Sequence, residues 1–296
     1  MLVLLRPANL DSVPLNRSFS EAVAAGKHRV PAAEWDGLGG AAMEHSLDVL
    51  AFGTHPDDLE LCCGGTLLLL ANRGHRVGAV DLTRGELGTR GSEEIRAKEA
   101  VVAGQILKLC VRENLGIPDG HIEKSQENLF RVIRVLRQYR PRLVLAPYWE
   151  ERHYDHVHAS HLVGEAAFYS GLAKIETGQE SFRPYRVIYY VGRMGFRPSF
   201  VVDISETFDA KMRAIRSYRS QFHQGTVEDD SGEPKTLIST PYAFEVFETM
   251  ARYYGAMIGG QFGEPFWMRE ALELRDPVSF FREFADTKQA HLFPSH

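Results

Sequence analysis

The sequence LDVLAFGTHPDD, residues 47–58, joins an apolar run to a cluster of chemically active side chains. The apolar run is typical of a buried parallel strand, and a helix is expected soon after it, over 65–72. His55, Asp57 and Asp58 lie between the two. Open α/β sheets bind their ligands at the carboxyl ends of their strands. We therefore expect His55 and Asp58 to hold one metal ion and Asp57 to remain free as a base.

A second polar cluster, ERHYDHVHASH at 151–161, follows another predicted buried strand, LVLA at 143–146. Two clusters at the same edge of one sheet can face each other. A catalytic zinc site needs three protein ligands and one open position, so one histidine of this cluster would complete the set, and spacing alone does not identify it. A bound divalent ion lowers the pKa of water toward about 7 and polarises a carbonyl oxygen. A His153–Asp155 pair could stabilise charge or donate a proton.

Each cluster also has a simpler interpretation. The aspartates at 57 and 58 could cap the next helix, and a histidine-rich helix start is often only a solvated end. Two such clusters, each at a strand-to-helix junction, favour the metal site. The loop TRGELGTRG at 83–91 follows a further strand but has the spacing of neither a dinucleotide fingerprint nor a P-loop. Arg84 and Arg90 could bind an anion there, or the loop could be an ordinary surface loop.

The remaining pattern predicts an α/β fold with a mainly parallel sheet and helices on both faces. Strands are expected at 47–52, 75–82, 110–115, 143–146, 186–191 and 200–204. Helices are expected from Ser92 onward and at 126–139, 156–172, 205–221 and 243–258, with Ser205 as a cap and a polar loop at 224–235. We predict one domain over 46–296, whose last third adds strands and pocket walls. Residues 1–45 have two interpretations: they are a flexible N-terminal extension, or they arise from an upstream start codon in a chain that really begins at Met43.

Composition excludes several classes of function. The 296 residues carry a net charge of -5, so no basic footprint for nucleic acid is present. No apolar run approaches the roughly 20 residues of a membrane span. The three cysteines do not form a disulfide framework, and we interpret them as small buried hydrophobic residues of a cytoplasmic protein.

AFGTHPDDLE at 51–60 resembles the (A)HPDD(x)E motif of the LmbE/PIG-L superfamily of zinc-dependent N-deacetylases. HYDH at 153–156 resembles that family's HPDH motif, with Tyr154 in place of a proline that is not a ligand. DLTRGELGTRG at 81–91 looks most like the branch of bacillithiol biosynthesis deacetylases. The likeness covers about 47–266 and implies a Rossmann-like fold and assembly into hexamers.

The resemblance also implies roles for individual residues. By motif position, the zinc ligands are His55, Asp58 and His156, the general base is Asp57, and the charged pair that supports the tetrahedral intermediate is His153 and Asp155. Tyr242 would help to hold the oxyanion. Substrate contacts are expected from Arg96, Arg152 and Arg186. The candidates to bind the anionic groups of the substrate are Arg84, Arg90, Arg96 and Arg152. These ligands also suit Fe²⁺ and other divalent ions.

The implied activity is zinc-dependent removal of the acetyl group from an N-acetylglucosaminyl conjugate, with release of acetate. The small-molecule substrate that the bacillithiol branch implies is N-acetylglucosaminyl-malate. Three alternatives remain open: the same chemistry on a chitooligosaccharide, another N-acetylglucosamine compound or a thiol conjugate; a nucleotide-binding module without a metal; and a catalytically inactive sugar-binding relative.

Overall fold

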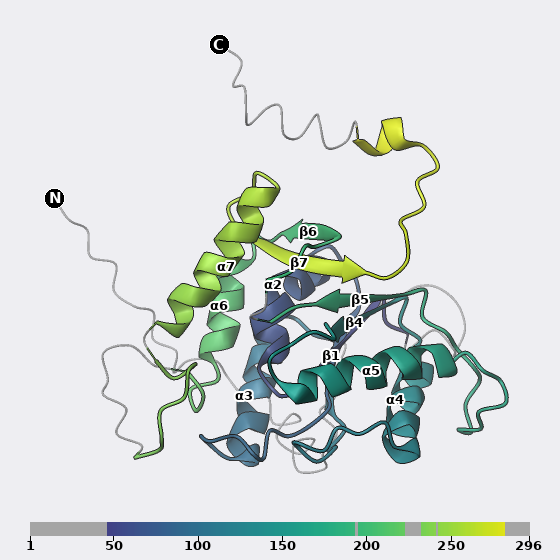
Figure 1. The fold of residues 1–296 in the computed structure, drawn as a ribbon, viewed down its shortest axis with the longest axis horizontal. Helices are drawn as coiled ribbons and strands as arrows, with labels where there is room; N and C mark the ends of the chain where they lie inside the picture. The colour runs from purple at the N-terminus through teal and green to yellow at the C-terminus, as the bar shows by residue number, and fades with distance from the viewer. Residues whose placement is uncertain (1–45, 193–194, 223–231, 241, 282–296) are drawn as a thin grey trace.

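A seven-stranded sheet with the order β3-β2-β1-β4-β5-β7-β6 organises the part of the chain that the computed structural model describes, residues 46–192, 195–222, 232–240 and 242–281 (Figure 1). Strands β1 to β5 pair in parallel, and β7 lies antiparallel between β5 and β6. The strands are β1 Val49–Gly53, β2 Val77–Asp81, β3 Val111–Asn114, β4 Leu143–Pro147, β5 Arg186–Tyr190, β6 Phe200–Asp203 and β7 Gly263–Met268. The predicted α/β class with a mainly parallel sheet is confirmed.

Helices cover both faces of this sheet, as predicted (Figure 1). One hydrophobic cluster joins the strands to α2 Asp58–Asn72, α3 Glu93–Ile106, α6 Phe208–Arg216 and α7 Ala243–Met257. A second cluster joins them to α4 Gln126–Tyr139 and α5 Tyr154–Tyr169. No helix in the described ranges has the length and apolar character that crossing a membrane requires. The predicted extension at 1–45, and most of the polar loop expected at 224–235, lie outside the described residues.

Three local predictions need correction. Helix α2 begins at Asp58 instead of residue 65. Its central glycines disfavour a helix by propensity alone, but close packing accommodates them, since a Cβ at Gly65 would approach Ile204 to 2.8 Å. Helix α6 covers only Phe208–Arg216. Ser205 does not cap it, because its hydroxyl accepts hydrogen bonds from the amides of Gln261 and Phe262, both at 3.1 Å. Strand β7 was not predicted.

The strand order places the predicted site at a topological switch point. The sheet grows from β1 toward β2 and β3 in one direction and toward β4 and β5 in the other. Open α/β sheets form a crevice outside the carboxyl ends of the strands at such a point. The loops that follow β1 and β4 carry the two polar clusters, so both lie at this carboxyl edge. Because β7 runs in the opposite direction, its first residues reach the same edge.

Candidate metal centre and its cavity

The loop between β1 and α2 holds the first polar cluster in a tight backbone arrangement. The amide of His55 donates a hydrogen bond of 2.8 Å to Oδ2 of Asp58, the first residue of α2. Asp57 precedes α2 with φ 113° and ψ -25°, a left-handed backbone conformation that is unusual for a residue with a side chain. Such a conformation costs on the order of 1–3 kcal/mol and persists where surrounding contacts enforce it, most often at functional sites.

His55, Asp58 and His156 form a candidate metal triad. One ligand atom from each lies within 4.8 Å of the others. Oδ2 of Asp58 is 3.4 Å from Nδ1 of His55 and 3.2 Å from Nε2 of His156. Two imidazole nitrogens and one carboxylate oxygen are a donor set that suits zinc and several other divalent ions. These residues therefore fit a divalent cation, and the geometry selects His156 from the histidines that the sequence left open.

A second combination, His55, His153 and Asp155, also places one ligand atom of each residue within 4.8 Å of the others. Nε2 of His55, however, lies 3.0 Å from Oδ1 of Asp119 and 3.4 Å from Oδ2 of Asp155. A carboxylate on the outer nitrogen of a ligating histidine fixes its tautomer and orientation. Nδ1 of His55 is then available as the ligand atom, and that atom faces Asp58. This arrangement favours the first triad.

Asp119 is a site residue that sequence reasoning missed, because it lies in a Pro-Asp-Gly stretch at 118–120, which is typical of an ordinary turn. Besides its contact with His55, its Oδ2 accepts a hydrogen bond of 3.0 Å from the amide of Leu87 in the glycine-rich loop. Burial would raise the pKa of Asp119, but the hydrogen bond with His55 prevails and lowers it. Its position one turn after β3, at the carboxyl edge, is a signal that was available in the sequence.

The predicted pairing of His153 with Asp155 takes a different form in the structure. Nδ1 of His153 accepts a hydrogen bond of 3.2 Å from the backbone amide of Asp155 and thereby caps α5. The Asp155 carboxylate accepts a hydrogen bond of 2.9 Å from the amide of Gly120 and lies near His55. The side chains of His153 and Asp155 therefore each lie beside His55, whose ring centroid is 5.0 Å from that of His153.

The two neighbouring aspartates have opposite electrostatic environments. Burial raises the pKa of Asp57 to about 7, although the guanidinium of Arg96 opposes the rise. Burial would also raise the pKa of Asp58, but the attraction of His156 and His55 holds it well below its usual range. Separation of the pKa values of two adjacent carboxyl groups commonly assigns them different chemical roles. Asp58 stays ionised as a ligand, whereas Asp57 can exchange a proton near neutral pH.

Arg96 contacts the candidate base directly. Its side chain is buried, and its Nη2 lies 3.2 Å from Oδ2 of Asp57 and donates to the carbonyl oxygen of Pro56. Its Nη1 donates to the carbonyl oxygen of Gly85 at 3.3 Å. Arg96 therefore joins the loop after β1 to the glycine-rich loop.

The other arginines and Tyr242 have varied positions. Arg152 is exposed and lines the cavity. Arg90 is buried and donates to the backbone carbonyl oxygens of Ser220 and Pro234. Arg84 forms an exposed ion pair with Glu93 at 3.3 Å. Arg186 lies at the start of β5, at the opposite edge of the sheet, and stacks on Tyr185. Tyr242 is 69% exposed at the start of α7 and is not among the cavity-lining residues, so its role at an oxyanion stays a prediction.

A buried ion-pair network supports the loop from behind. Arg112 of β3 forms two hydrogen bonds with Asp81 at 2.9 and 3.0 Å and a third with Glu60 in the first turn of α2. All three residues are buried. The network ties the start of α2 to the last residue of β2 and to β3. It gives a structural reason for the glutamate in the (A)HPDD(x)E pattern.

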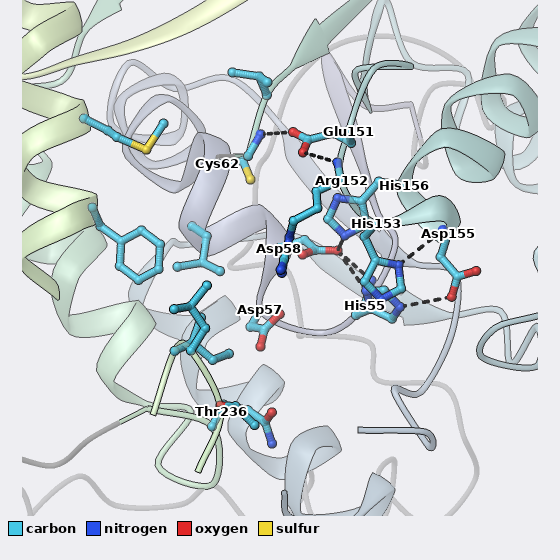
Figure 2. A pocket seen from close by; sticks show the side chains of 18 of the residues that line it. His55, Asp57, Asp58, Cys62, Glu151, Arg152, His153, Asp155, His156 and Thr236 are labelled. Atoms are coloured by element: carbon cyan, nitrogen blue, oxygen red, sulfur yellow. Dashed lines mark hydrogen bonds and ion pairs between the residues drawn. The ribbon is translucent and has the colours of Figure 1, made fainter. Parts of the chain in front are cut away.

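These residues surround a cavity of about 490 Å³, within the range of small-molecule sites (Figure 2). Figure 2 shows the histidines and aspartates of both clusters on one side of it, with Cys62 and further apolar side chains toward α7. Of the predicted site residues, the cavity brings together His55, Asp57, Asp58, Arg96, Arg152, His153, Asp155 and His156. Two of the predicted residues that it does not include, Arg84 and Arg186, have exposed or distant partners.

Comparison with known proteins agrees with this geometry. Residues 50–167 match the family described as PIG-L, GlcNAc-PI de-N-acetylase. Diacetylchitobiose deacetylase of Thermococcus kodakarensis is 31% identical over 232 residues, which cover 73% of this chain and 80% of that relative. Probable N-acetyl-alpha-D-glucosaminyl L-malate deacetylase 2 of Bacillus anthracis is 29% identical over 198 residues, 61% of this chain and 84% of the relative. The crystal structure of conserved protein TT1542 from Thermus thermophilus is 39% identical, with a TM-score of 0.69, and covers 77% of this chain and 98% of that one.

Proposed function

This chain belongs to the PIG-L family of de-N-acetylases, and from that membership we propose that it removes the acetyl group from the nitrogen of an N-acetylglucosamine compound. The observation that carries the proposal is the position of Asp57. Its carboxylate lies beside the His55–Asp58–His156 triad without being part of it, and all four residues line one cavity. A base next to a Lewis-acid site is the arrangement that amide hydrolysis requires.

The metal triad fits zinc, which we propose as the resident ion, with Fe²⁺ as the alternative. When bound, a divalent ion supplies polarisation of the amide carbonyl and a lowered pKa for a water molecule. The chain's own contribution is to orient the ligands. Asp119 holds the outer nitrogen of His55 at 3.0 Å, and the His55 amide holds the Asp58 carboxylate at 2.8 Å.

Proton transfer is assigned to Asp57. Its carboxylate takes a proton from the attacking water and returns one to the leaving nitrogen, which departs as the free amine while the acyl group becomes acetate. Arg96 holds this carboxylate in one orientation. Burial and the neighbouring imidazoles of His55 and His156 lower the pKa of His153. We therefore assign His153, in its neutral form, a hydrogen-bonding role toward the developing oxyanion.

The finer substrate is a choice between two N-acetylglucosamine conjugates. N-acetylglucosaminyl-malate is supported by the relative in Bacillus anthracis and by the glycine-rich loop, and diacetylchitobiose is supported by the relative in Thermococcus kodakarensis. Arg152 is exposed at the cavity and is the candidate contact for a malate carboxylate. Arg90 and Arg96 already donate to protein oxygens, which reduces the support for malate.

The setting of the enzyme follows from its chemistry. We propose a small sugar conjugate as its partner and the cytoplasm as its compartment, because Cys62 and Cys63 are buried free thiols. Assembly into a homo-oligomer remains a prediction from the family resemblance.

The test is amine release from three compounds: N-acetylglucosaminyl-malate, diacetylchitobiose and free N-acetylglucosamine. Each is measured with added zinc and with a chelator. The proposal predicts release that the chelator abolishes, and preference for one conjugate identifies the substrate. Release that survives removal of all bound metal, or the absence of release from metal-loaded protein, would contradict it.

A further inference from the structure

The cavity has two unlike halves. One half carries the metal triad, Asp57 and His153. The other half, which we name the apolar arm, is lined by Leu61, Cys62, Val191, Phe247, Met250 and Ala251. The residues of the first half perform the proposed hydrolysis of the amide. The apolar arm has no part in that chemistry, so its composition bears on which substrate is bound.

Helix α2 connects the two halves. Leu61 and Cys62 come three and four residues after Asp58, so they lie on the same helix face about 5.4 Å further along the axis. Gly65 lies about 10 Å from Asp58 along the same axis. The Gly65 amide donates a hydrogen bond of 2.9 Å to the carboxylate of Glu264. The apolar arm therefore runs along α2 from the metal triad toward Glu264.

A buried ion pair closes the far end of the apolar arm. Nζ of Lys211 lies 2.6 Å from Oε1 of Glu264, and both side chains line the cavity. The Glu264 carboxylate also accepts hydrogen bonds from the amides of Gly65 and Thr66. Removing one partner of a buried pair is strongly destabilising, so a ligand is not expected to displace this one. The pair limits the length of a group that the apolar arm can hold.

Burial decides which part of a substrate enters the apolar arm. Cys62, Val191 and Phe247 are 7%, 3% and 9% exposed, so the arm lies in the interior. Arg152 and His153, in the other half, are exposed. A sugar placed against Leu61, Val191 and Phe247 would lose water from its hydroxyl groups without gaining hydrogen-bond partners from those side chains, which is unfavourable. The sugar therefore belongs beside the exposed Arg152 and His153, and the group attached to the amide carbonyl points toward the apolar arm.

We propose that the apolar arm binds the acyl chain of an N-acylglucosamine whose acyl group is longer than acetyl, an inference that rests on the proposed amide hydrolysis. Water cleaves the amide C–N bond: its hydroxyl joins the acyl carbon and its proton joins the nitrogen, so the products are a carboxylic acid and a free amine. Each methylene buried in the arm raises kcat/KM by roughly fourfold, until the chain reaches the ion pair.

The experiment compares amine release from N-acetyl-, N-butyryl-, N-hexanoyl- and N-dodecanoylglucosamine by the zinc-loaded full chain. Hexanoyl has four more methylenes than acetyl, so we expect kcat/KM to rise by up to roughly 250-fold from acetyl to hexanoyl and to fall again for dodecanoyl. Met250→Asp places a charge in the apolar arm and should lower the hexanoyl-to-acetyl ratio by about tenfold or more. Met257→Asp, at a half-exposed position on the same helix, is the matched control and should leave both the ratio and the acetyl rate unchanged.

The outcomes separate this inference from the proposed function. Turnover of the acetyl compound without any gain for butyryl or hexanoyl would overturn the acyl assignment and leave the deacetylase intact. The same gain for a hexyl glycoside of N-acetylglucosamine, and none for the longer acyl groups, would assign the arm to the aglycone and also overturn it. No release from any compound would refute both proposals.

Discussion

Replacing Gly85 with alanine should impair proton transfer by Asp57 without changing the Asp57 side chain. Gly85 has φ +70°, and a Cβ at this position would lie 2.0 Å from Nη1 and 2.6 Å from Cζ of Arg96. The guanidinium must therefore shift, which disturbs its contact of 3.2 Å with Asp57. The substitution tests whether Arg96 positions Asp57 or, as the family resemblance implies, binds the substrate.

The expected magnitude follows from the contact that is lost. A hydrogen bond to a charged group contributes about 1.5–3 kcal/mol. If this contact is needed in the transition state, kcat falls by roughly tenfold to 150-fold. The positive φ separately destabilises an alanine at position 85 by about 1–2 kcal/mol. Gly74→Ala is the matched control, because Gly74 has φ +86° and no atom lies within 4 Å of its Cβ position.

The assay measures kcat and KM for amine release from the malate conjugate and from diacetylchitobiose. Positioning by Arg96 predicts a loss of kcat that is equal for both substrates in Gly85→Ala and absent in Gly74→Ala, whose loss of stability comes from the positive φ alone. An unchanged kcat in Gly85→Ala would refute this reasoning. A rise in KM confined to the malate conjugate would return Arg96 to the role of a substrate contact.

Three further predictions concern the metal and the fold. His156→Ala should remove most bound zinc, measured by elemental analysis after dialysis, and full occupancy would exclude His156 as a ligand. Asp119→Asn should weaken zinc binding by about 10–100-fold in a competition with a chelating dye, because the outer nitrogen of His55 loses its carboxylate partner, and unchanged affinity would assign Asp119 a different role. Arg112→Met should lower the free energy of unfolding by about 3–5 kcal/mol in urea denaturation, because Glu60 and Asp81 would remain buried without a partner, and a loss below about 1 kcal/mol would show that this network contributes little.

Local sequence was sufficient to predict the strands β1 and β4 and the polar clusters that follow them. The apolar runs of β1 and β4 each end at a cluster of histidines and acids, and parallel sheets bring such ends together. The cap at Ser92, whose hydroxyl accepts from the amide of Ile95 at 3.3 Å, is likewise a local feature. The ligand types in the two clusters indicated a metal site before any contact between them was known.

Features set by distant segments were not predictable in this way. Strand β7 contains Glu264 and Pro265, which interrupt its apolar pattern, and it is defined by antiparallel pairing with β5 and β6. The family resemblance assigned Arg96 to the substrate, whereas its contact with Asp57, 39 positions earlier in the chain, leaves no local sequence signal. The apolar arm is lined by residues of α2 and α7, which lie far apart in the chain, and neither helix carries a sequence signal of this arrangement.

The most direct test of the central claim is amine release by Asp57→Asn, measured beside the wild-type chain at equal zinc content. The account predicts that the variant binds zinc normally and loses about 10²–10⁴-fold in kcat, because the asparagine amide keeps the shape of the side chain but cannot accept the proton. Wild-type turnover by a zinc-loaded Asp57→Asn variant would contradict the assignment of Asp57 as the base.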